Sequence, residues 1–205
     1  YGSFTLVAST WTYTLDQSKV QDLDQGDVVT DTTTFIASDG STQQINVTIT
    51  GTNDAAVVSG DITGTINEGN IGDAAVTATG TLAITDVDAN DTPSFTDVAS
   101  TTGENDYGSF TLVESTWTYT LDQSKVQDLD QNDQISDSIT FTATDGSTQM
   151  VDVTIIGTND IPSLETSLPD QVSSTGSNFN FNVNTGVFND LDADDTLTFS
   201  ALQSD

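Results

Sequence analysis

The sequence predicts an all-β fold made of tandem antiparallel sandwich domains, and three observations carry this prediction. A long block of residues occurs twice in nearly the same form, strand-like runs recur roughly every ten residues between turn signals, and no segment keeps a helical period. Apolar and polar residues alternate within these runs, as strands with one buried and one solvated face require. Short alternating strands with regularly spaced turns are typical of antiparallel sandwiches.

The repeated block is residues 1–54, which return as residues 107–160 with roughly 41 of the 54 positions identical. The offset of 106 residues (107 − 1) is the size of one small domain rather than a solenoid turn. We therefore expect residues 1–54 to be the C-terminal half of one domain, 55–160 a complete domain and 161–205 the N-terminal part of a further domain. This division predicts that the chain is a segment of a longer protein. An alternative phase, in which each domain starts at the tyrosine, stays open.

Within the first block, residues 4–7 and 10–15 are expected to form a hairpin. Its second arm places Trp11, like its counterpart Trp117, on an apolar face, which favours the core over a sugar-stacking surface. Residues 16–31 form a polar loop with at most one helical turn. Further strands are expected at 33–37, 45–49, 57–58, 62–66, 81–85, 95–98, 179–183 and 197–201.

The charge balance is extreme, because two lysines face 32 acidic residues and give a formal charge of −30. Nothing here can neutralise phosphates, so nucleic acid is excluded as a likely class of partner. Self-repulsion of this size destabilises a compact chain unless cations neutralise it. Many acidic chains are disordered, but the alternating Thr, Val, Ile and aromatic runs favour a folded β domain.

Several other classes of protein find little support. The chain has no cysteine, so disulfides and thiolate metal sites are excluded, and no apolar run approaches the roughly twenty residues of a membrane helix. It also lacks histidine and arginine, and a catalytic pocket is not usually duplicated at domain spacing. A glycosidase-like pair of carboxylates remains a formal alternative, but we do not expect an enzyme.

Four motifs recur in the same order in both blocks, and in the first block they are Tyr1-Gly2-Ser3-Phe4-Thr5-Leu6, Trp11-Thr12-Tyr13-Thr14-Leu15, Asp39-Gly40-Ser41 and Gly51-Thr52-Asn53-Asp54. Together they resemble the VCBS repeats of giant RTX-type bacterial adhesins, which are cadherin-like modules. The resemblance covers residues 1 to about 160, and the tail from Ile161 resembles the start of another cadherin-like domain. It implies Greek-key sandwiches of the cadherin and immunoglobulin type, located outside the cell or on its surface.

Two acidic loops match one another, Asp86-Val87-Asp88-Ala89-Asn90-Asp91-Thr92 and Asp190-Leu191-Asp192-Ala193-Asp194-Asp195-Thr196. Alternate carboxylates in a loop direct several oxygens at one point, which suits Ca²⁺, a hard ion that takes six to eight oxygen ligands. The central glycine and the closing glutamate of an EF-hand are absent, so this is another kind of site.

The resemblance to cadherin-like domains implies that calcium lies at the junctions between modules. The first junction would gather Asp39, Asn53, Asp54, Asp86 and Asp88; the second would gather Glu68, Asp145, Asn159, Asp160, Asp190 and Asp192. Gly51 and Gly157 stand where cadherin linkers usually begin with aspartate, which implies fewer ions at each site. A solvated acidic surface is the alternative.

Two further features leave alternatives open. A second acidic loop recurs in each block, and its members are Asp22, Asp24, Asp27 and Asp31 with Asp128, Asp130, Asp133 and Asp137. Nothing else in the sequence indicates that this loop binds metal. Lys19 and Lys125 occupy equivalent positions, which suggests an isopeptide cross-link, although their polar surroundings favour a simple ion pair or a solvated lysine.

Together with these patterns, the resemblance implies a calcium-stabilised extender segment of a large extracellular bacterial adhesin, which projects an adhesive tip for cell adhesion or biofilm formation. The expected partners are neighbouring domains of the same chain and, in a further alternative, other copies of the chain. A second hypothesis is a domain that binds a glycan or peptide through calcium. A third is a filament subunit whose sheet edges are completed by neighbouring chains.

Overall fold

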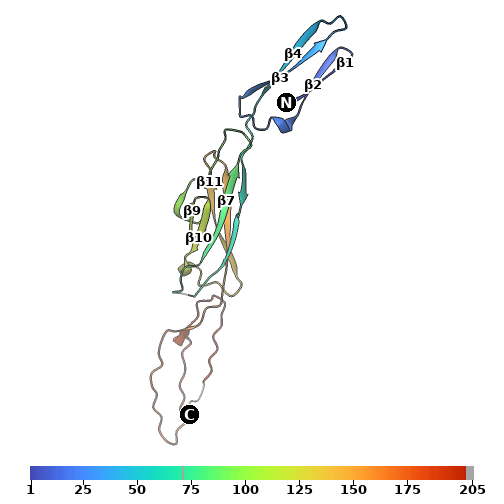
Figure 1. The fold of residues 1–205 in the computed structure, drawn as a ribbon. Coiled ribbons are helices and arrows are strands. Elements are labelled where there is room, and N and C mark those ends of the chain that lie inside the picture. Colours follow the sequence, from blue (N-terminus) through green and yellow to red (C-terminus); the bar gives the residue numbers. More distant parts are fainter. Residues whose placement is uncertain (71, 202–205) are drawn as a thin grey trace. The chain divides into compact units, whose positions relative to one another are not determined.

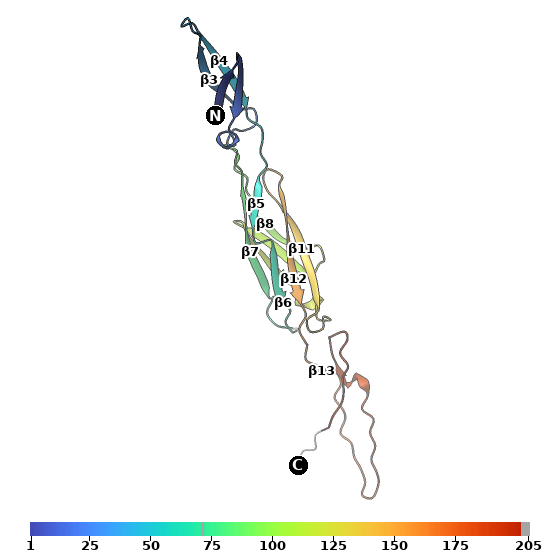
Figure 2. The same cartoon turned by 90° about the vertical axis from the view of Figure 1, so that its right-hand side faces the viewer.

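The computed structural model describes residues 1–70 and 72–201, and it confirms an all-β fold with several antiparallel sheets. Contacts divide the chain into two units (Figures 1 and 2). The first contains residues 1–59, 82–95 and 142–148, and the second contains 60–81, 96–141 and 149 onward.

In the first unit, most strand residues belong to two hairpins. Strand β1 (Gly2–Val7) pairs with β2 (Thr10–Leu15), and β3 (Val28–Ile36) pairs with β4 (Thr42–Thr50) over nine residues each. The expected hairpin and the strand at 45–49 are confirmed, and the single helical turn in the polar loop is the 3₁₀ helix η1 (Gln17–Lys19). Strand β3 starts five residues earlier than the expected 33, because Val28 already pairs with Thr50.

The remaining elements follow the expected order. They are β5 (Val57–Gly60), β6 (Thr63–Asn67), β7 (Thr77–Thr85), β8 (Val98–Thr102), β9 (Gly108–Val113), β10 (Thr116–Leu121), η2 (Gln123–Lys125), β11 (Gln134–Thr142) and β12 (Thr148–Ile156). One sheet has the strand order β5-β7-β10-β9-β8, and another has the order β11-β12-β6. In the second sheet β6 runs parallel to β12, and this is the one parallel pairing among those described.

The core of the second unit follows the period of two that the sequence predicts. Alternate side chains of β9, β10 and β12 are almost completely buried, namely Phe110, Leu112, Trp117, Tyr119, Leu121, Val151, Val153 and Ile155. The Trp117 indole donates from Nε1 to the Asp61 carbonyl at 2.7 Å. Gly80 and Gly64 lie against its ring so closely that an added Cβ would come within 2.7 and 2.9 Å of it. The expectation that Trp117 is a core residue is therefore confirmed.

Trp11 differs, although its hairpin has the same sequence. It is 43% exposed, whereas Trp117 is completely buried. The groups that cover Trp117 belong to Asp61, Gly64 and Gly80, and the described residues provide no equivalent cover for Trp11. A core position for Trp11 is therefore not formed in this chain.

The tail shows less regular structure than the sequence predicts. Among the described residues after 160, strands are limited to β13 (Ser163–Leu164) and β14 (Phe188–Asn189), with the short helix η3 (Thr185–Val187) before β14. The strands expected at 179–183 and 197–201 are absent, and Phe181 and Phe199 remain 42% and 45% exposed. An isolated apolar strand needs partner strands to be stable, and this stretch finds none.

Candidate metal sites

The first candidate site lies in the acidic loop that follows β7. Carboxylate oxygens of Asp86, Asp88 and Asp91 lie within 4.8 Å of one another. The loop holds this shape through its own backbone, because the Asp88 amide donates to Asp86 Oδ1 at 3.0 Å and the Asp91 amide donates to the Asp88 carbonyl at 3.2 Å. The alternate aspartates thus converge as predicted, and Asp91, which we did not include among the ligands, joins them.

Asp88 connects this loop to the linker and is the most buried of the three. It is 3% exposed, and its Oδ2 accepts a hydrogen bond from the Asp54 amide at 3.0 Å. Its other oxygen, Oδ1, is buried without a hydrogen-bond partner among the described residues. A buried, unpartnered carboxylate oxygen is costly unless a cation or another donor satisfies it.

The acidic loop that contains Asp22 and Asp24 also contacts this site. Asp24 accepts hydrogen bonds from the backbone amide of Asn90, at 3.1 Å, and from the Asn90 side chain. These bonds hold the pKa of Asp24 below its ordinary value. The Ala89 amide donates to the Asp22 carbonyl at 3.1 Å in the same contact. Sequence reasoning had no evidence for this role; the one available signal was the unchanged recurrence of Asp22 and Asp24 as Asp128 and Asp130.

A cavity of about 440 Å³ lies beside the first cluster, and its wall includes Asn53, Asp54, Asp86, Asp91, Thr92, Thr144, Asp145 and Ser147. The pKa of Asp91 is raised, first by desolvation and then by the charges of Asp86, Asp24, Asp88 and Asp145. The four aspartates of the cavity wall, Asp54, Asp86, Asp91 and Asp145, thus concentrate negative charge around one space.

The position of Asp145 differs from the expected assignment of ligands to the two junctions. Asp145 was placed with the second junction, but it lines the cavity of the first. The reason is that β12 extends for nine residues between the Asp145 turn and the Gly157 linker, so the two lie roughly 30 Å apart at the usual rise per residue. Asp39 sits in the equivalent turn of the first block, where it accepts bonds from Ser41, and β4 separates it from Asn53 and Asp54 in the same way.

The second candidate site resembles the first, with Asp192 and Asp195 equivalent to Asp88 and Asp91, but Asp130, the counterpart of Asp24, takes the place that Asp86 has in the first cluster. Oxygens of Asp130, Asp192 and Asp195 lie within 4.8 Å of one another. The Asp160 amide donates to Asp192 Oδ2 at 2.9 Å, and the Asp194 amide donates to Asp130 Oδ1 at 3.1 Å. The Asp192 amide in turn donates to Asp190 Oδ1 at 3.2 Å. The matched loops therefore share these backbone hydrogen bonds with the first site, although the third carboxylate of the cluster differs.

Glu68 adds a carboxylate to the second site. Its Oε1 accepts a hydrogen bond from the Thr158 amide at 2.9 Å. Desolvation, followed by the charges of Asp160, Asp192 and Asp128, raises the pKa of Glu68 to about 7. The pKa values of Asp160 and Asp192 are also raised, mainly by desolvation. Three buried oxygens here lack hydrogen-bond partners among the described residues, namely Glu68 Oε2, Asp160 Oδ2 and Asp192 Oδ1.

No positive side chain of the described residues compensates either cluster. The positive groups pair elsewhere: the Tyr1 amine with Asp31, Lys19 with Asp16 and Lys125 with Asp106. Two oxygen-only clusters with unpartnered buried oxygens fit a hard divalent cation. Asn53 and Asn159 donate their side-chain amides to the carbonyls of the following aspartates, which leaves their side-chain oxygens available as ligands.

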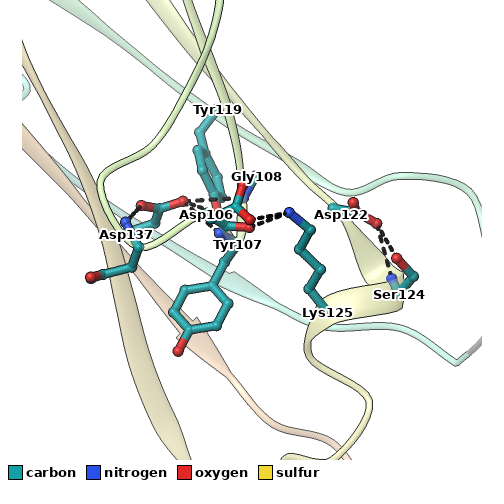
Figure 3. Close-up of polar contacts among 9 residues, drawn as sticks. Asp106, Tyr107, Gly108, Tyr119, Asp122, Ser124, Lys125 and Asp137 are labelled. Carbon is teal, nitrogen blue, oxygen red and sulfur yellow. Dashed lines mark hydrogen bonds and ion pairs between the residues drawn. The ribbon is translucent and has the colours of Figure 1, made fainter.

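Two other singled-out residues have structural explanations (Figure 3). Lys125 forms an exposed ion pair with Asp106, with Nζ 2.7 Å from Oδ2, and it also donates to the Asp106 carbonyl. Asp137 is completely buried and accepts hydrogen bonds from the amides of Asn105, Tyr107, Gly108 and Ser138 and from the Tyr119 hydroxyl. The ion-pair interpretation of Lys125 is therefore confirmed, and Asp137 organises the loop before β9.

Comparisons with known proteins add no identification. No protein-family model matches the chain, and a search of curated proteins finds no match. Among residues 1–70 and 72–201, no helix has the length and apolar character needed to cross a membrane.

Proposed function

We propose that the chain is a calcium-stabilised extender segment of a large extracellular bacterial adhesin. The observation that carries the proposal is the pair of equivalent acidic sites with buried, unpartnered carboxylate oxygens, Asp88 Oδ1 in one and Glu68 Oε2, Asp160 Oδ2 and Asp192 Oδ1 in the other. The resemblance of the repeated motifs to VCBS repeats supports the location and the stalk role.

Each site includes a linker residue, Asp54 or Asp160, whose amide is already bonded to the central aspartate of the loop. An ion bound to that aspartate would stiffen the linker. Extracellular calcium modules bind with dissociation constants of about 10⁻⁴ to 10⁻³ M, so such sites fill outside the cell and stay empty in cytosol. Stiffening would then follow export.

Calcium titration by calorimetry tests the proposal, with Asp192→Asn, Asp88→Asn and Asp170→Asn compared with the unchanged chain. Asp170 is exposed and lies outside both clusters, so its variant controls for the loss of one charge. We expect binding in the submillimolar to millimolar range, weakened about ten-fold or more at one site by each cluster variant and unchanged by the control. Absence of binding, or equal weakening by all three variants, would contradict the proposal.

A second candidate function is favoured by the cavity at the first site. Its wall includes Asp86, Asp91, Thr92 and Ser147, so a calcium ion and hydroxyl groups would border the same space, a combination suited to a neutral glycan. A glycan array read in calcium and in chelator tests it. Calcium-dependent binding that Thr92→Ala abolishes supports a ligand-binding domain, and its absence leaves the extender role alone.

A further inference from the structure

Strands β6 and β12 form a parallel pair in the second unit and lie side by side in Figure 2. Their register runs from Thr63 opposite Asp152 to Asn67 opposite Ile156. The chain enters this pair at the start of β6 and leaves the second unit's sandwich strands at the end of β12, towards Asp160. Opposite ends of the pair are therefore attached to the incoming and outgoing chain.

Hydrogen bonds extend this ladder beyond the paired strands at both ends. The Asp152 amide donates to the Ile62 carbonyl at 3.1 Å, and the Glu68 amide donates to the Ile156 carbonyl at 3.0 Å. Past the last rung, the Thr158 amide donates to Glu68 Oε1 at 2.9 Å. The ladder thus ends in a contact between a side chain and the linker.

Apolar side chains shield the ladder on its inner face. Ile66 is 7% exposed, and Val153 and Ile155 are completely buried. Gly64 lies against the buried Trp117. Water therefore has limited access to replace these hydrogen bonds from the core side, and an unmade buried bond is expensive.

We infer that the β6–β12 pair is a force-bearing clamp for tension transmitted along the chain. Tension pulls β6 towards its N-terminal end and β12 towards its C-terminal end, so the two parallel strands are sheared past each other. The hydrogen bonds of the ladder lie across this direction and are loaded together. Strands pulled apart from the same end would instead lose their bonds one at a time.

Glu68 connects the clamp to the second acidic site. Its amide makes the last rung, and its carboxylate lies with Asp160 and Asp192. An ion there would tie the end of β6 to the segment after β12, so calcium should strengthen the clamp. Tension along the chain rests on the proposed extender role and this last step on the proposed calcium site, whereas the shear geometry rests on neither.

Single-molecule pulling on the full chain tests the clamp, because the absence of cysteine lets engineered cysteines define the pulling axis. One handle is Thr63→Cys, at the exposed start of β6. The second is Ile161→Cys for the shear axis or Thr148→Cys for the peeling axis; both residues are exposed. Urea unfolding of each double variant verifies that the handles leave the fold intact and equally stable.

In chelator, we expect the unfolding force along the shear axis to exceed that along the peeling axis by about two-fold or more, since several bonds break together. Equal forces along both axes would overturn the clamp. In millimolar calcium, a further rise confined to the shear axis supports the link through Glu68. Anisotropy without any calcium effect would keep the clamp and count against the proposed calcium site.

Discussion

Individual carboxylates of this chain have very different roles, and their surroundings decide which. Glu68 lies among acids without a neutralising partner, and its pKa is raised to about 7. Asp137 is completely buried but is surrounded by five hydrogen-bond donors. The first arrangement requires a cation or a proton, whereas the second is satisfied by the protein itself.

The raised pKa of Glu68 predicts a pH dependence of stability in chelator. A carboxyl whose pKa is higher in the folded state than in the unfolded state favours folding when protonated, so its contribution is lost as pH rises. With an unfolded value of 4.5 and a folded value of about 7, the melting temperature should fall between these pH values. Glu68→Gln should reduce that fall, although the raised pKa values of Asp160 and Asp192 leave part of it. A melting temperature that rises over this range in chelator would contradict the prediction.

Asp137→Asn should destabilise the second unit, because an amide cannot accept from the same five donors without leaving some unpaired. We expect a loss of about 2 to 4 kcal/mol in the free energy of unfolding, as for hydrogen bonds to a buried charge. Asp31→Asn is the matched control. Asp31 accepts hydrogen bonds from Gly2 and Tyr13 but is partly exposed, so this substitution should lower the free energy of unfolding by less. Urea denaturation of both variants measures the difference, and equal losses would refute the burial argument.

Among the elements, the two hairpins show that identical sequence does not guarantee identical packing. Strands β1 and β2 have the same residues as β9 and β10, and both hairpins turn through two residues with positive φ, Ala8-Ser9 and Glu114-Ser115. The local hairpin geometry is therefore reproduced. The residues that cover the hairpin are not reproduced, and the burial of the tryptophan depends on those residues.

Replacing each tryptophan in turn, with Trp117→Ala and Trp11→Ala, tests this difference in burial. Removing the completely buried Trp117 should cost about 3 to 5 kcal/mol, as large-to-small core substitutions do. Trp11 is already 43% exposed, so its removal should cost much less. Thermal melts of both variants, compared with the unchanged chain, provide the measurement. Equal destabilisation would mean that Trp11 is covered in solution.

At the scale of the whole molecule, the charge of −30 opposes every compact arrangement of the chain. Among the described residues, strands carry few of the acids: those in strands are Asp31, Asp137 and Asp152, and the others lie in loops, turns and the tail. Repulsion therefore concentrates at the loops, where the two acidic sites are.

Salt should consequently stabilise the calcium-free chain. Raising sodium chloride from roughly 0.01 M to 1 M shortens the screening length from about 30 Å to 3 Å, so the melting temperature in chelator should rise. Calcium should act at far lower concentration, contributing about 2.7 kcal/mol per site at one hundred times its dissociation constant. If calcium and sodium chloride at matched ionic strength gave the same rise, screening alone would explain the effect.

The sequence by itself determined the all-β class, the order of most strands, the core face of β10 and the two converging acidic loops, because period and local turn chemistry are properties of adjacent residues. It also singled out Glu68, Asp88, Asp160 and Asp192 as candidate ligands; these four residues carry buried oxygens without hydrogen-bond partners among the described residues, and metal binding by them stays a prediction. Only the tertiary structure decided that Asp145 joins the first site, that Asp24 and Asp130 contact the loops, and that Trp11 stays uncovered. Each of these depends on which end of a strand faces which neighbour, and no local pattern records that.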